Sequence, residues 1–137
     1  MPRITRWMIK SSFLYFSVGI TMGAYLLLHK AWSISPASWS VLPYHIEIMI
    51  FGWILQFVMA VAYWMMPRFV EGPPRGPRWH SWVMFGLLNG GIWLHLAGLA
   101  LGKMGWMILI GRILEVGAVA MFVKIHWSRI YGIRAFH

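Results

Sequence analysis

The sequence predicts an all-α fold, an integral membrane four-helix bundle, and three observations lead to it. Of the 137 residues, 60% are hydrophobic and 11% are charged, whereas a soluble domain carries roughly 25% charged residues. The apolar residues gather into four blocks of about 20 residues, the length that crosses a hydrocarbon core of ~30 Å as a helix. The blocks show no alternation with a period of two, which argues against transmembrane strands. We expect a single transmembrane domain, residues 1–137, with helices at about 12–32, 43–66, 82–101 and 106–127.

The first block, residues 12–32, is long, contains glycine and ends in His-Lys rather than at a small-residue cleavage site. We therefore expect a permanent spanning helix and not a cleavable signal peptide. Its Gly19-x-x-x-Gly23 pattern favours close helix packing, and spaced glycines can also leave room for a flat macrocycle. Pro43 suits the first turn of the second helix.

The connections complete the topology. The Pro- and Gly-rich segment at 67–81 is expected to be a loop. The turn "LGKMG" is short, so the third and fourth helices should be antiparallel neighbours. Six tryptophans fall near predicted helix ends, where an interfacial aromatic belt is expected. They are Trp32, Trp39, Trp79, Trp82, Trp106 and Trp127.

The formal net charge of +9 is distributed as a topology signal. Most lysines and arginines lie in the N-terminal tail, in the second loop and at the C-terminal end, while Lys30 and Lys103 lie on the other side. The positive-inside rule then places both termini and the 67–81 loop in the cytoplasm of a bacterial-type inner membrane. Nucleic-acid binding is not expected. The chain has no cysteine, so any cofactor must be held by His, Met, Glu or backbone groups rather than by thiolates.

Ionisable groups within the membrane are costly and are functional candidates. At a rise of ~1.5 Å per residue, His29, His45, His95 and Arg112 lie at similar depth near the outer surface. Three histidines and an arginine at one level of a four-helix bundle are suited to binding haem, with imidazoles on the iron and Arg112 on the propionates. Hydrogen bonding between helices is the alternative use for each. His80, His126 and His137 are interpreted as interfacial.

The second helix carries a stripe of related positions. At about 100° per residue, His45, Met49, Gly52 and Gln56 share one face, and Gly52 leaves a slot in which a ring could lie. Glu47 points about 200° away from His45, so these two residues cannot chelate one metal from one helix. We expect them to face different neighbours.

Arg112 and Glu115 are spaced to pair with each other on the fourth helix, and we favour this self-satisfied ion pair. In the alternative, Glu115 joins Asn89 and Gln56 in a polar spot that binds a proton or a quinol.

The stretch "HIEIMIFGWILQFVMAVAYWMMPR" resembles the second helix of haem–copper oxidase subunit I, in the cbb3-type and nitric-oxide-reductase branch. The match runs through His45, Met49-Ile50-Phe51 and Pro67. "YFSVGITMGAYLLLHKAW" and "PRWHSWVMFGLLNGGIWLHLAGLALG" look like the first and third helices of that family, so the resemblance spans most of the chain.

The resemblance implies that His45 is an axial ligand of a low-spin haem b. In the family, the second axial ligand comes from a later helix of the large subunit, which this chain lacks. The chain also lacks the copper-site and high-spin haem ligands of the family, so we do not expect it to reduce oxygen or nitric oxide on its own. The family's subunit I has twelve helices in three pseudo-symmetric arcs of four, and this chain looks like one arc. By analogy, a homo-oligomer of three copies would imitate the large subunit.

Three functions follow as hypotheses. The first is a membrane b-type cytochrome in electron transfer or diatomic-gas chemistry, with a quinol or cytochrome partner. Its second ligand would be His95 or His29, or His45 of a neighbouring copy. The second is a colourless accessory subunit of a larger respiratory complex. The third is a haem- or copper-handling protein for oxidase assembly, with His29 and His45 helped by Met22 and Met49, because thioethers favour Cu(I).

Overall fold

The computed structural model describes residues 1–32, 36–66 and 78–131, and every element in these ranges is helical. Four of the helices are long and apolar enough to cross a membrane. The prediction of an all-α, four-helix membrane protein is therefore confirmed. Most of the predicted 67–81 loop and His137 lie outside the described residues.

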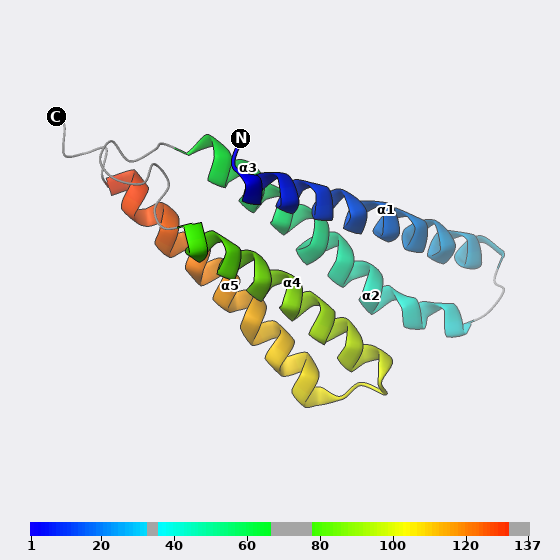
Figure 1. The fold of residues 1–137 in the computed structure, drawn as a ribbon. Helices are drawn as coiled ribbons and strands as arrows, with labels where there is room; N and C mark the ends of the chain where they lie inside the picture. Colours follow the sequence, from blue (N-terminus) through cyan, green and yellow to red (C-terminus); the bar gives the residue numbers. More distant parts are fainter. Residues whose placement is uncertain (33–35, 67–77, 132–137) are drawn as a thin grey trace.

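The elements follow one another as two helical hairpins (Figure 1). In the first hairpin, α1 (Arg3–Trp32) is followed by the 3₁₀ turn η1 (Pro36–Val41) and by a second membrane-spanning helix. That helix comprises α2 (Leu42–Glu47), the π-helical stretch η2 (Ile48–Leu55) and α3 (Gln56–Met65). In the second hairpin, α4 (Arg78–Ala100) is followed by α5 (Gly105–Tyr131).

The helices extend beyond the apolar blocks from which they were predicted. α1 begins at Arg3 rather than at residue 12, and α4 begins at Arg78 rather than at residue 82. Polar side chains in these first turns can reach the headgroup region while the backbone keeps its helical hydrogen bonds. An apolar block therefore marks the hydrocarbon core and not the full helix.

Local sequence explains the helix ends. Pro43 stands in the first turn of α2 as expected. Between α4 and α5, Gly102 and Lys103 take positive φ angles of 81° and 62°, which reverses the chain within a few residues. The two helices of this hairpin are consequently antiparallel neighbours, as the short "LGKMG" turn predicts.

The apolar core lies between the hairpins, where Met84, Leu88 and Ile92 of α4 are fully buried together with Met8 of α1 and Ala60 of α3. The outer faces of the helices carry many exposed large apolar residues, as a lipid-facing surface should. The six tryptophans predicted to form the interfacial belt are all exposed.

The start of α1 and the end of α5 lie at one end of the molecule (Figure 1). Arg3, Arg6 and Lys10 of α1 and Lys124 and Arg129 of α5 belong to these segments, while Lys30 lies at the opposite end of α1 and Lys103 in the turn between α4 and α5. The positive-inside rule predicts that the more basic end is cytoplasmic. The two hairpins diverge toward the other end, on the side of α2 (Figure 1), the helix that carries His45.

Candidate functional site

His45 is held against α1 by a hydrogen bond to the backbone. Its Nδ1 atom lies 2.9 Å from the carbonyl oxygen of Gly19, and the side chain is half-buried. A carbonyl oxygen only accepts hydrogen bonds, so Nδ1 carries the proton and donates it. In a neutral imidazole the lone pair then resides on Nε2, which is the form that binds a metal through that atom.

The two glycines of the Gly19-x-x-x-Gly23 pattern make this arrangement possible. A Cβ added at Gly23 would lie 2.9 Å from Cε1 of His45, and a Cβ at Gly19 would overlap Sδ of Met49. Both glycines thus receive a side chain of the second spanning helix. The pattern serves close packing, and one of the side chains it admits is the candidate ligand.

The predicted stripe on the second spanning helix is present and faces α1. His45 and Met49 contact the glycines, and Gln56 donates to the carbonyl oxygen of Met8 at 3.1 Å and to the hydroxyl of Ser11.

Gly52, predicted to leave a slot for a cofactor ring, has that slot filled by the ring of Tyr15. A Cβ added at Gly52 would lie 2.6 Å from Cγ of Tyr15. The flat group accommodated by this glycine is a tyrosine side chain of α1, so the structure does not support Gly52 as a cofactor-binding residue.

Glu47 faces the second hairpin, on the opposite side of its helix from His45. Its side chain is fully buried, and Oε2 lies 2.6 Å from Nη2 of Arg112 on α5. The expectation that His45 and Glu47 contact different neighbours is confirmed. Glu47 and Arg112 are 65 positions apart in the sequence. Helical periodicity could not predict this ion pair, because it shows which face of a helix a residue occupies and not which helix packs against that face.

Arg112 is shared between two carboxylates. Its Nη1 atom donates to Oε2 of Glu115 at 2.6 Å, as the spacing predicts, while Nη2 engages Glu47. The guanidinium also lies over the ring of Phe51, 4.6 Å from its centroid. Arg112 therefore faces away from His45, and this arrangement does not support its predicted contact with the propionates of a haem bound there.

His95 belongs to the same cluster. Its Nε2 atom lies 3.3 Å from Nη2 of Arg112 and 3.7 Å from Oε2 of Glu47. Arginine can only donate, so Nε2 of a neutral His95 is an acceptor engaged by Arg112. Nε2 of His95 therefore already has a partner.

His29 lies in the last turn of α1, with Nδ1 2.6 Å from the hydroxyl of Ser38 and its ring against Tyr25. Over the part of the chain that the structure describes, no hydrogen bond or ion pair joins His45 to His29 or His95, and no group of three or more His, Cys, Asp or Glu side chains could hold a metal ion. In the described part of the chain, these three histidines contact other groups and not one another.

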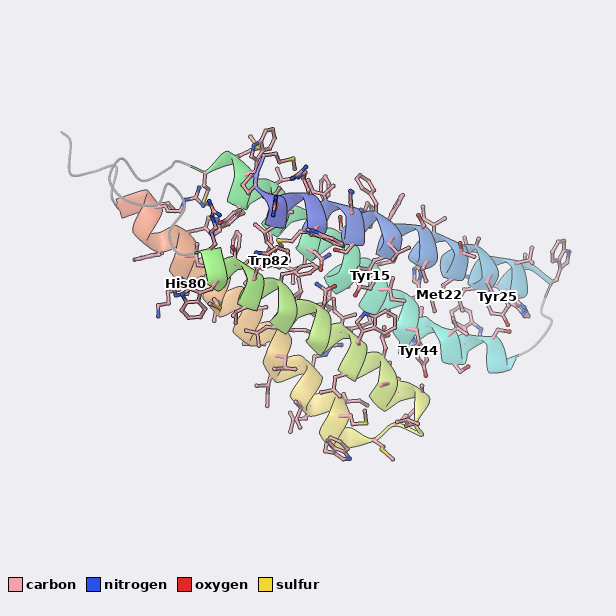
Figure 2. The ribbon with its side chains drawn as sticks, viewed as in Figure 1. Tyr15, Met22, Tyr25, Tyr44, His80 and Trp82 are labelled. Carbon is pink, nitrogen blue, oxygen red and sulfur yellow. The ribbon has the colours of Figure 1, made fainter. Side chains whose placement is uncertain are left out.

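A second polar network lies nearer the middle of the bundle. Tyr15 donates to Oδ1 of Asn89 at 2.9 Å, and Asn89 donates to Oε1 of Gln56 at 2.9 Å and to the carbonyl oxygen of Phe85. Tyr15 reaches this network from the side of α1 that faces the second hairpin (Figure 2). Glu115 bonds Arg112 instead, so these contacts do not form the predicted spot made by Glu115, Asn89 and Gln56.

Comparison with known families identifies the chain. Residues 3–136 match the family model for cytochrome c and quinol oxidase polypeptide I. The chain belongs to the oxidase subunit I family. No curated protein and no solved structure gives a match.

Membership of the subunit I family agrees with the observed helical membrane fold and relates the chain to haem-binding membrane proteins of the oxidases. The family resemblance seen in the sequence is therefore confirmed at the level of subunit I.

Sequence reasoning missed a buried arginine at the end of the bundle where α1 begins and α5 ends, next to His126, which is buried rather than interfacial. Arg129 is 2% exposed, and its Nη2 atom donates to the carbonyl oxygen of Met66 at 2.5 Å. Tyr63 contributes a further carbonyl acceptor and a ring beneath the guanidinium, and it also packs edge-on against His126. Arg129 lies just beyond the predicted block 106–127 and was counted as a topology charge. The unsatisfied carbonyls at the end of the second spanning helix were the available signal.

Proposed function

We propose that this chain is a membrane b-type cytochrome of the oxidase subunit I family and that His45 is an axial ligand of its haem. The observation that supports this most directly is the hydrogen bond from Nδ1 of His45 to the carbonyl of Gly19. Metal-binding histidines commonly donate their other ring N–H to a carbonyl or a carboxylate, which fixes the tautomer and the ring orientation. Such a haem would exchange single electrons with a quinol or a cytochrome partner.

The residues around His45 fit this role. Gly23 leaves the space that the imidazole occupies, and the side chain is half-buried, so the ring is oriented but not enclosed. By contrast, Nε2 of His95 is engaged by Arg112, and His29 bonds through Nδ1 to the hydroxyl of Ser38 rather than to a backbone carbonyl. His45 is the histidine of the outer half that we assign to iron.

The second axial ligand is proposed to come from another copy of the chain, as His45 of a neighbour. The support is that, in the described part of one chain, His29 and His95 bond Ser38 and Arg112 and make no bond to His45. A second support for an intermolecular ligand is that the family's subunit I is built from repeated four-helix arcs. A ring of three copies, each acting as one arc, is the arrangement we propose.

An absorption spectrum of the purified protein tests the haem proposal. We expect a Soret band and a reduced α-band, both lost in His45→Ala and retained in His95→Ala and His29→Ala. A colourless wild-type protein expressed with sufficient haem, or bands that survive in His45→Ala, would show the assignment to be incorrect.

Native mass spectrometry in mild detergent tests the oligomer. We expect a mass equal to three chains, and haem that dissociates together with the oligomer. A haem-containing species with the mass of one chain would contradict the intermolecular ligand.

A colourless accessory subunit is the second candidate. It is favoured by the way polar groups at membrane depth satisfy one another, as Glu47, Arg112 and Glu115 do. In this case the protein would bind no haem and would co-purify with a large respiratory complex, which the same spectrum and a pull-down distinguish. The described residues give no comparable support to a copper site built from His29 and His45.

A further inference from the structure

The short helix α2 is anchored from opposite sides by two residues that are two positions apart. His45 bonds the backbone of α1 at 2.9 Å, and Glu47 pairs with Arg112 of α5 at 2.6 Å. The two anchors thus belong to different hairpins. A helix held at two points on opposite faces cannot rotate about its own axis without breaking one of them.

The surrounding helix gives this turn little other definition. α2 has six residues and is followed directly by the eight-residue π-helical stretch Ile48–Leu55. Long π-helical runs are rare because their hydrogen bonds span one residue more than in an α-helix. Contacts outside the helix therefore contribute to setting the rotation of the turn that carries His45.

We propose that the Glu47–Arg112 ion pair is a positioning device that sets the rotation of α2 and so directs the imidazole of His45 onto the carbonyl of Gly19. The pair touches neither His45 nor its partner, and acts through the helix. This inference rests on the proposed function only in assigning His45 to iron. The rotation itself is a property of the chain without cofactor.

The chain contains a matched control for this pair. Glu115 makes an equally short contact with the same guanidinium, 2.6 Å from Nη1, and its side chain is 1% exposed. However, Glu115 lies on α5 with Arg112, so its removal does not release α2. A general effect of removing a buried carboxylate should appear in both Glu47→Gln and Glu115→Gln, whereas an effect of rotation should appear only in Glu47→Gln.

The first measurement uses the protein without haem. NMR of ¹⁵N-histidine-labelled protein in lipid nanodiscs, with the His45 signal assigned by His45→Gln, reports the Nδ1–H hydrogen bond to Gly19. We expect this signal to shift or disappear in Glu47→Gln and to persist in Glu115→Gln and in Arg112→Lys, which keeps the charge. Equal loss in both glutamine variants, or persistence in both, overturns the proposal.

If Glu47→Gln does not fold, Glu47→Asp retains the charge but withdraws it by one methylene and must perturb the His45 signal more than Glu115→Asp does.

The second measurement uses haem-loaded protein, in which the low-spin electron paramagnetic resonance signals report the orientation of the axial imidazole. They should shift in Glu47→Gln and not in Glu115→Gln. A colourless wild type combined with the expected NMR result would reject the haem assignment and leave the positioning role intact.

Discussion

Among the described residues, the close glycine contacts lie within each hairpin, whereas the hairpins meet through larger side chains, both apolar and polar. Within hairpins, glycines let helices approach closely, as at Gly23 beneath His45 and at Gly91, where an added Cβ would lie 2.8 Å from the carbonyl oxygen of Gly111. Between hairpins, polar side chains reach across, as in the Glu47–Arg112 pair and the bond from Tyr15 to Asn89. In a bilayer, apolar side chains gain little by exchanging contacts with lipid for contacts with one another. Helix association therefore depends on close packing and on polar contacts.

This difference shows which contacts determine the pairing of helices and which determine the orientation of one hairpin against the other. Glycine contacts bring together helices that adjoin in sequence, and short connections already favour that pairing. The two hairpins could meet in several rotations, and polar groups with fixed partners select one of them because any other leaves them unsatisfied in lipid.

The strongest test of the polar contacts is Arg112→Ala. It leaves Glu47 and Glu115 buried without their cation, which costs about 3 kcal/mol, the lower end of the range for a broken buried pair, because Arg112 itself is 39% exposed. We expect the hairpins to separate at milder denaturant concentrations in equilibrium unfolding. The additional substitutions Glu47→Gln and Glu115→Gln should restore part of the lost stability. Unchanged unfolding of Arg112→Ala would mean that the pair does not hold the hairpins.

The glycine contacts are tested by Gly91→Ala, with Gly90→Ala as its neighbour control. The new methyl group at Gly91 meets backbone atoms of α5, which can yield only if the helices separate, at a net cost of about 2 kcal/mol. Gly90 has nothing within 4 Å of its would-be Cβ, so Gly90→Ala should be neutral or stabilising by up to ~1 kcal/mol through helix propensity. Thermal unfolding of both variants provides the comparison, and equal midpoints would refute it.

A smaller effect is expected from Asn89→Ala, which removes the junction between Tyr15 and Gln56. Interhelical hydrogen bonds in membranes contribute about 0.6 kcal/mol on average, so the loss of two should cost about 1 kcal/mol in the free energy of unfolding. Ser17→Ala, which removes an exposed bond within α1, is the control and should have no measurable effect. If the two variants unfold alike, the central network contributes little to hairpin association.

The smallest effect on stability is expected from Gly23→Ala. The methyl group would press on the ring of His45, while the gain in helix propensity of ~1 kcal/mol offsets much of the cost. Stability should hardly change, but the His45–Gly19 bond should be disturbed. In ¹⁵N NMR the His45 signal should move while the unfolding midpoint stays near that of the wild type. An unmoved signal would show that the imidazole can accommodate the methyl group elsewhere.

Sequence reasoning was most successful where one helix carries the information. The four apolar blocks, the stripe from His45 to Gln56, and the Arg112–Glu115 pair all follow from length and period, and the structure contains each of them. The opposed directions of His45 and Glu47 follow from the same geometry. These features depend on spacing alone.

Features that join distant helices could not be predicted in the same way. Placing histidines at one depth said nothing of their directions, so His95 was grouped with His45 although it contacts Arg112 instead. The space beside Gly52, predicted to admit a cofactor ring, is filled by Tyr15, which lies on another helix. The depth of a residue in the membrane and the helix face that it occupies are local properties. Its contact partners on other helices can be predicted only when the neighbouring helices are known.

The π-helical stretch Ile48–Leu55 lies between the two residues that fasten the second spanning helix to α1, His45 above it and Gln56 below it. A hydrogen-bonding pattern one residue wider than that of an α-helix takes up surplus chain between fixed points. The stretch can thus be understood as a register adaptor. It allows the N-terminal part of the spanning helix to match the glycines of α1 and the C-terminal part to match Ser11 and Asn89, without either set of partners having to shift.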